Sequence, residues 1–190
     1  MFNFKIYFMS EQSPLSLGTE DIKKLLMRYA VPAIVAMTAA SLYNMMDSIF
    51  IGHGVGALGI AGLAVTFPFI NLAAAFGSLV GVGASTLVSV KMGQKDLKSA
   101  EAVLGNVLLL NTVIGFLFMT VCLIFLDPIL YFFGASADTL PYARDYMKVI
   151  LYGNLITHIY MGLNEVMRAS GYPQRAMMAT LFAVLINGVL

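Results

Sequence analysis

The sequence predicts an all-α membrane protein, a polytopic bundle of helices that cross the bilayer several times. Hydrophobic residues make up 59% of the 190 residues and charged residues only 11%, whereas a soluble domain carries about 25% charged residues. The apolar runs between these sparse charges reach the ~20 residues that a bilayer core requires. Inside lipid the backbone must satisfy its own hydrogen bonds, so these runs are expected to be helices.

Four complete helices and the start of a fifth are predicted, separated by polar or glycine-containing connections. The predicted helices are residues 24–51, 58–90, 99–126 and 141–168, with the fifth starting near Arg175. Asp127 and Pro128 are expected to stop the third helix. Two domains follow: residues 1–22 form an amino-terminal tail, in which Met9 is an alternative native start to Met1, and residues 23–190 form a partial transmembrane lobe.

Lysine and arginine are concentrated at one end of the predicted bundle. The residues at this end are Lys5, Lys23, Lys24, Arg28, Lys91, Lys95, Lys98, Arg168 and Arg175. Arg144 and Lys148 fall at the other end. Because cytoplasmic loops collect lysine and arginine, the amino terminus is predicted to be cytoplasmic and the chain to lie in the inner (plasma) membrane. A net charge of only +1 makes nucleic acid an unexpected partner.

Small residues recur along the second predicted helix at intervals of four. They are Ala73, Gly77, Gly81, Ser85 and Ser89. Small side chains at this spacing are expected to form one smooth face against which another helix packs closely. The alternative interpretation is a surface along which helices slide during gating.

Asp47 is the leading functional candidate, because an ionised carboxylate within a membrane helix costs roughly 2.5 kcal/mol or more at the bilayer centre. Tyr43 and Asn44 precede it by four and three residues, so the three share one helix face suited to lining a wet cavity. Pro32 lies fifteen residues earlier and can kink the helix. The alternatives are a static proline and an interfacial aspartate hydrogen-bonded to a neighbouring helix.

Other polar residues of the membrane helices have plainer interpretations. His158 fits a hydrogen-bonded packing residue better than a proton relay, and Glu165 is expected to pair with Arg168. Asn164 is a candidate oxygen ligand of a cavity. Cys122 is the only cysteine, which excludes an intrachain disulfide, and no metal-ligand spacing surrounds it. No cofactor or metal is therefore expected.

The sequence does not contain the motifs of a membrane enzyme. The glycines of Gly54-Val-Gly56-Ala-Leu-Gly59 match a dinucleotide-binding pattern, but a membrane helix precedes them instead of a strand. They are interpreted as turn residues. With no hydrolase or metalloprotease motif in view, the chain is predicted not to be an enzyme.

Several motifs resemble the multidrug and toxic compound extrusion (MATE) family, in particular its prokaryotic DinF-like branch. They occur in order over residues 24–190: Pro32 with Tyr43-Asn-Met-Met-Asp47-Ser-Ile-Phe-Ile-Gly52, then Gly81-Val-Gly-Ala-Ser85, Gly134-Ala-Ser136, and Asn164-Glu-Val-Met-Arg168-Ala-Ser-Gly171-Tyr-Pro173. The resemblance implies a twelve-helix fold of two six-helix lobes, of which this chain holds an incomplete amino-terminal lobe. The carboxy-terminal lobe is then a missing partner.

The resemblance also implies a function, a multidrug efflux antiporter. Such transporters expel cationic or amphipathic small molecules from the membrane and cytoplasm by alternating access, driven by a proton or sodium gradient. Asp47 matches the family's cation-coupling aspartate, Asn187 its helix-five asparagine, Asn164 its cavity asparagine and Pro32 its bending proline. The acidic residue commonly four positions beyond Asn187 falls outside the 190 residues.

Two alternatives remain at this point, the first from the same superfamily and the second from another functional class. The first is a flippase for a lipid-linked precursor, which would require basic residues facing a cavity, whereas the first three predicted helices carry none buried. The second is a non-transporting membrane scaffold, which would tolerate an asparagine in place of Asp47.

Overall fold

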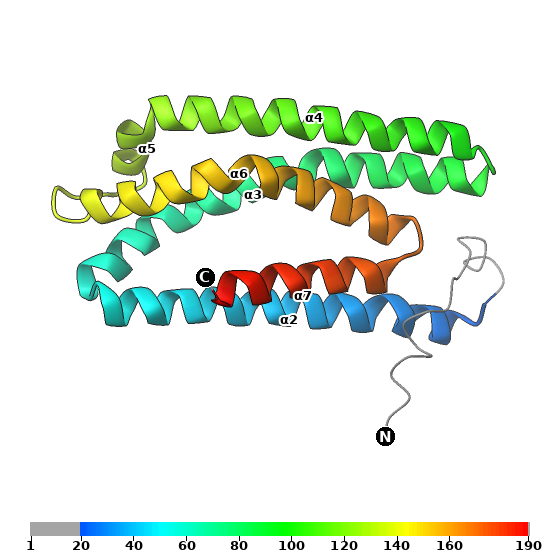
Figure 1. Ribbon diagram of the computed structural model, residues 1–190, viewed down its shortest axis with the longest axis horizontal. Coiled ribbons are helices and arrows are strands. Elements are labelled where there is room, and N and C mark those ends of the chain that lie inside the picture. Colours follow the sequence, from blue (N-terminus) through cyan, green and yellow to red (C-terminus); the bar gives the residue numbers. More distant parts are fainter. Residues whose placement is uncertain (1–19, 190) are drawn as a thin grey trace, which may run out of the picture.

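The structure, a computed structural model, describes residues 20–189, and the regular elements in this range are all helices (Figure 1). In chain order they are α2 (Ile22–Gly54), α3 (Ala57–Gly93), α4 (Leu97–Ile124), α5 (Leu126–Phe132), α6 (Leu140–Ala169) and α7 (Pro173–Val189). The predicted all-α fold is confirmed. Residues 1–19, which hold most of the predicted tail and both possible start methionines, lie outside the described range.

The predicted helices are all present, and local capping explains where they begin and end. The side chain of Asp21 accepts a hydrogen bond from the backbone N–H of Lys23 at 3.0 Å, so α2 begins at Ile22. The turn between α2 and α3 passes through Gly56 with φ of 87°, a conformation that glycine adopts without steric cost. Gly171, with φ of 91°, serves the same purpose between α6 and α7.

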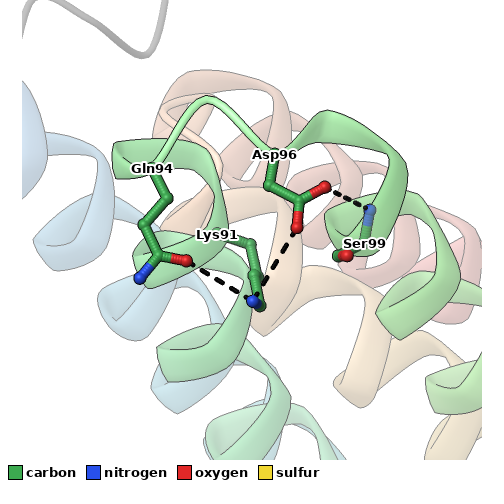
Figure 2. Close-up of polar contacts among 4 residues, drawn as sticks. All are labelled: Lys91, Gln94, Asp96 and Ser99. Carbon is green, nitrogen blue, oxygen red and sulfur yellow. Dashed lines mark hydrogen bonds and ion pairs between the residues drawn. The ribbon is translucent and has the colours of Figure 1, made fainter.

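The turn between α3 and α4 is held by a small polar cluster, drawn in Figure 2. Asp96 caps α4 by accepting a hydrogen bond from the backbone N–H of Ser99 at 3.1 Å. Lys91 Nζ lies 3.8 Å from Asp96 Oδ2 and donates to Gln94 Oε1 at 3.4 Å. The hydrogen bonds from Ser99, and to a lesser degree the charge of Lys91, hold the pKa of Asp96 below its ordinary value.

Asp127 and Pro128 do more than end the third predicted helix. The helix α4 ends at Ile124, and these two residues lie in the first turn of the short helix α5, which was not predicted. A proline is tolerated in a first turn because its missing N–H would have no partner there. Arg144 of α6 donates to both carboxylate oxygens of Asp127, with Nε 2.7 Å from Oδ1, and so fastens α5 to α6.

The helices are arranged in two layers (Figure 1). Helices α3, α4 and α6 pack on one another along their length, and α2 packs beside α7 in a second layer. One end of the bundle, called here the basic end, carries the α3–α4 and α6–α7 turns with Lys91, Lys95, Lys98, Arg168 and Arg175. The opposite end carries the α2–α3 turn and α5.

The small-residue face of α3 is a packing surface, but its second half was predicted wrongly. Ala73, Gly77 and Gly81 are buried, the two glycines against α6, and the line of buried residues then continues through Ala84 and Val88. A helix turns every 3.6 residues, so a spacing of four drifts about 40° per step around the axis. After three or four steps the predicted serines have rotated away, and their hydroxyls donate to carbonyls of their own helix.

Three helices among residues 20–189 are long and apolar enough to cross a membrane, namely α2, α3 and α4. The helix α6 was also predicted to span. Its 30 residues correspond to about 45 Å, which is long enough. It carries more polar side chains than the other three and buries several of them against neighbouring helices, where protein takes the place of lipid.

Candidate functional site

Asp47 and Tyr146 form a polar contact between the two layers of helices. The hydroxyl of Tyr146 on α6 donates a hydrogen bond to Asp47 Oδ2 on α2 at 3.0 Å. The two residues are 99 positions apart in the chain, and both side chains are half-buried. Among the described residues this is the hydrogen bond that the Asp47 carboxylate receives. The site is therefore a partly shielded carboxylate with a phenol as its neighbour.

Tyr146 was not predicted from the sequence, although the order and direction of the helices indicate it. Asp47 lies about two turns before the end of α2, and Tyr146 about two turns after the start of α6. Both segments belong to the opposite end of the bundle, since α2 and α6 run in opposite directions with respect to that end. A tyrosine at matching depth on the fourth predicted helix was therefore a possible donor to Asp47.

Tyr43 and Asn44, which were predicted to share a helix face with Asp47, differ in their burial. Tyr43 is half-buried one turn before Asp47, on the same side of α2. Asn44 is exposed, and its backbone carbonyl accepts a hydrogen bond from the Ser48 hydroxyl at 3.0 Å. The structure thus brings Tyr43, Asp47 and Tyr146 to one place, with Asn44 at its margin.

Asn164 lies in a second polar group, toward the basic end and between α6 and α7. Its side chain is only 6% exposed. Its Nδ2 donates to the carbonyl of Ala176 at 3.0 Å, and its Oδ1 accepts from Arg168 Nε at 2.9 Å. Tyr160 and Thr180 add a hydroxyl–hydroxyl contact of 2.7 Å between the same helices. Asn164 therefore joins α6 to α7, and the structure does not bring it to Asp47.

This group also corrects a predicted ion pair. Glu165 was expected to pair with Arg168, but the guanidinium of Arg168 bonds the amide of Asn164 instead. Glu165 lies on the side of α6 that approaches α3, with its Cβ next to Gly81. Successive residues on a helix point about 100° apart, so neighbours in sequence face different helices.

The positions of Pro32 and Asn187 follow from those of α2 and α7. Pro32 is buried inside α2, which continues as one helix through it from Ile22 to Gly54. Asn187 belongs to α7, whose end lies beside the half of α2 that carries Asp47 (Figure 1). The side chain of Asn187 falls outside the described side chains. Their predicted roles in bending and coupling remain predictions.

Asp47 is a half-buried carboxylate with one phenol donor and a second phenol a turn away. Carboxylate oxygens are the ligands that small hard cations prefer. No group of three or more histidine, cysteine or acidic residues able to hold a metal occurs within residues 20–189.

Comparison with known proteins identifies the family. The MatE family model matches residues 32–190, which is most of the chain and includes Pro32, Asp47 and Tyr146. The chain belongs to the MatE family. Its similarity to the multidrug export protein MepA of Staphylococcus haemolyticus is 28% identity over 182 residues, and to MepA of Staphylococcus aureus (strain MRSA252) 27%. These alignments cover 96% of the chain and 40% of each relative.

Solved structures place the MatE chain in the same architecture. A crystal structure of MATE in the straight conformation aligns with a TM-score of 0.85 and 27% identity, over 95% of this chain and 40% of that one. A transporter of the multidrug resistance MATE family in an outward-facing conformation aligns with a TM-score of 0.86 over the same shares. The chain thus spans about 40% of the length of its relatives and corresponds to a part of one lobe of the MATE fold.

Proposed function

We propose that this chain works as part of a multidrug efflux transporter and carries the ion-coupling carboxylate of that transporter at Asp47. In this proposal the full-length protein exports cationic or amphipathic small molecules by alternating access, as an antiporter driven by a proton or sodium gradient. The observation that carries the proposal is the hydrogen bond from Tyr146 to Asp47, which ties the charge state of one carboxylate to the contact between two helix layers.

The argument for coupling rests on the position of that contact. The layer of α2 and α7 touches the layer of α3, α4 and α6 where α7 packs on α6 and where α2 packs on α3, and the Tyr146–Asp47 hydrogen bond joins α2 to α6. A carboxylate accepts this phenol hydrogen bond most strongly when ionised, and a bound cation competes for the same oxygens. Cation binding at Asp47 therefore changes how firmly α2 is held to α6.

The comparisons support the same proposal. The curated relatives are named multidrug export proteins, and MATE has been solved in both a straight and a bent conformation at 27% identity to this chain. Pro32 gives α2 a backbone position without an N–H donor, at which the helix bends more easily than elsewhere. We include Pro32 in the proposal as the bending point and Asn187 as a second candidate residue for cation coupling.

The orientation in the membrane belongs to the proposal as well. Lysine and arginine gather at the basic end, and Arg144, at the opposite end, is neutralised by Asp127. The positive-inside rule then places the basic end in the cytoplasm of a bacterial inner membrane. Asp47 lies toward the opposite end, so its coupling ion would enter from the outer side.

The test is drug-dye efflux by the full-length protein in liposomes with an imposed proton or sodium gradient. The Asp47→Asn variant keeps the size of the side chain and its ability to accept a hydrogen bond but removes the charge. Gradient-driven efflux is expected to fall by at least about a hundredfold, the factor that corresponds to roughly 2.7 kcal/mol of lost coupling.

Asp145→Asn is the matched control, because Asp145 is an exposed carboxylate beside Tyr146 on α6. The control variant should transport as well as the wild type. Equal gradient-driven efflux in Asp47→Asn and wild type would refute the coupling role. Transport of a phospholipid-linked sugar in place of the dye would support the flippase alternative.

A further inference from the structure

The α3–α4–α6 layer has a buried histidine that the proposed coupling does not use. His158 is 1% exposed and lies where α6 crosses both neighbours. A β-carbon placed on Gly77 of α3 would be 3.4 Å from His158 Cγ, and one placed on Gly115 of α4 would be 3.3 Å from His158 Cβ. The imidazole therefore packs directly against glycines of two neighbouring helices, so that even a methyl group added at either glycine would touch His158.

The hydrogen bonds of His158 fix the tautomer of its neutral form. Nδ1 lies 2.9 Å from the backbone carbonyl of Asn154, and a carbonyl only accepts, so Nδ1 carries the proton. Nε2 is then a bare acceptor, and it has no hydrogen-bond partner among the described residues. The ring of Phe118, with its centroid 5.8 Å away, covers another side of the imidazole.

Two further polar side chains, both amides, are buried near His158 along α6. Asn154, 4% exposed, has an Nδ2 without a partner, and Asn111 of α4, 0% exposed, has neither of its side-chain polar atoms paired within residues 20–189. The amide of Asn111 occupies the place where a side chain on Gly162 would begin, one turn of α6 beyond His158. Unpaired buried polar atoms of this kind destabilise the packed state.

Within residues 20–189, no acidic group faces the imidazole. α3 presents Gly77 and has no titratable residue along its membrane part, and α4 presents Gly115 and Phe118, with Cys122 a turn further on. On α6 the titratable neighbours are Tyr152 and Tyr160, which lie on other faces of the helix, and Glu165, about two turns away against Gly81. A positive charge on His158 would have no counter-charge in the packed state.

We propose that His158 is a second proton-binding site, separate from Asp47, and that binding a proton there opens the packing of α3, α4 and α6. Protonation adds a charge and a second donor, Nε2–H, in a space that can satisfy neither. The unpaired Oδ1 of Asn111 is an acceptor one turn away, and the ring reaches it only if the crossing at Gly115 loosens. Because the loosened state binds the proton more readily, lowering the pH favours that state.

The chain contains its own reporter of this opening. Cys122 is the single cysteine, 5% exposed, and it packs in the core between α4 and α6 one turn from Phe118. The test measures the rate at which a disulfide reagent labels Cys122 in the full-length protein, with cysteines and histidines outside this chain replaced. The rates are compared between about pH 7.5 and about pH 5.5, where histidine changes its charge.

Two variants separate the effect of His158 from other effects of pH on labelling. His158→Asn keeps a donor for the Asn154 carbonyl but cannot gain a charge. His53→Asn is the matched control, because His53, the other histidine, makes the same type of contact, 3.0 Å from the carbonyl of Ile49, on an exposed face of α2. Relative to His158→Asn at each pH, labelling of the wild type and of His53→Asn should rise at least about tenfold over the interval.

Equal pH dependence in the wild type and His158→Asn would overturn the proposal. A second measurement covers the case in which His158→Asn does not fold. In histidine-labelled His53→Asn protein, NMR should show the neutral imidazole signal losing intensity as a separate signal grows in with Cys122 labelling. A single signal that moves smoothly through the ordinary midpoint of about 6.5, or one that does not change, would also overturn it.

Discussion

At the residue scale, the contact that decides the candidate site is the hydrogen bond between Tyr146 and Asp47. The phenol reaches the carboxylate from a different helix layer, so its loss removes both a donor to Asp47 and a tie between α2 and α6. Hydrogen bonds to charged groups contribute about 1.5–3 kcal/mol, so the loss of this contact is large enough to measure.

The corresponding prediction concerns Tyr146→Phe, which removes one hydroxyl and leaves the ring in place. Gradient-driven efflux by the full-length protein is expected to fall about tenfold or more, the factor given by the loss of one hydrogen bond to a charged group. Tyr152→Phe is the control, since Tyr152 lies on the same helix and is 68% exposed. Similar losses in the two variants would show that the Asp47 contact is not what matters.

Residue-scale sequence reasoning located the carboxylate but not its partner. Asp47 stands out because an acidic residue in an apolar helix is costly wherever the helix packs. Tyr146 does not stand out, because tyrosine is common near the ends of membrane helices. The positions of Asn164 and Arg168 were decided by which face of α6 meets α7.

At the scale of elements, the close approach of α3 to α6 depends on two facing glycines. A β-carbon placed on Gly81 would be 2.7 Å from the Cα of Gly162, a distance that real β-carbons do not show and that only backbone movement can relieve. Two positions further along the same helix, Gly83 has nothing within 4 Å of its added β-carbon. Comparing an alanine at Gly81 with an alanine at Gly83 therefore separates the packing effect of a methyl group from its effect on helix propensity.

Gly81→Ala is expected to lower the thermal unfolding midpoint of the full-length protein in detergent, because overpacking a tight crossing costs about 1–3 kcal/mol. Gly83→Ala should be neutral or raise the midpoint, since alanine is favoured over glycine in a helix by up to about 1 kcal/mol. A midpoint for Gly81→Ala at or above that of Gly83→Ala would contradict the glycine crossing.

The helix boundaries show which elements follow from local sequence. α2, α4 and α7 begin where an aspartate cap or a proline allows a start, and the predicted ranges agree with them within a few residues. The short helix α5 was not predicted, because a proline after an apolar run indicates a helix end, whereas Pro128 lies in a first turn, where proline is tolerated. Its place is set by the pair between Asp127 and Arg144, a contact across 17 residues.

At the scale of the whole molecule, the orientation in the membrane decides which end of the two-layer bundle faces the cytoplasm and which faces the outside. α2, α3 and α4 are long and apolar enough to span, and the turn after α2 lies at the opposite end from the turn after α3. In the proposed orientation, the turn after α2 is therefore accessible only from outside and the turn after α3 only from the cytoplasm.

The test is labelling of intact cells with a membrane-impermeant thiol reagent, in a Cys122→Ser background. Val55→Cys, in the α2–α3 turn where Val55 is 51% exposed, should be labelled from outside. Lys95→Cys, in the exposed α3–α4 turn, should be labelled only after the cells are permeabilised. The reverse pattern would refute the proposed orientation, and each variant serves as the control for the other.

The sequence by itself determined the all-α membrane class and the order of the helices, showed the resemblance to the MATE family through its motifs, and marked Asp47 as the candidate carboxylate. The class, the helix order and the candidate follow from quantities that are local in the chain: apolar length, charge distribution and the cost of a carboxylate in lipid. Tertiary structure alone decided that Tyr146 bonds Asp47, that Asn164 joins α6 to α7 and that His158 lies between two glycines. These contacts depend on where helices cross and how far each has rotated, and a drift of about 40° per four residues changes which side chains meet.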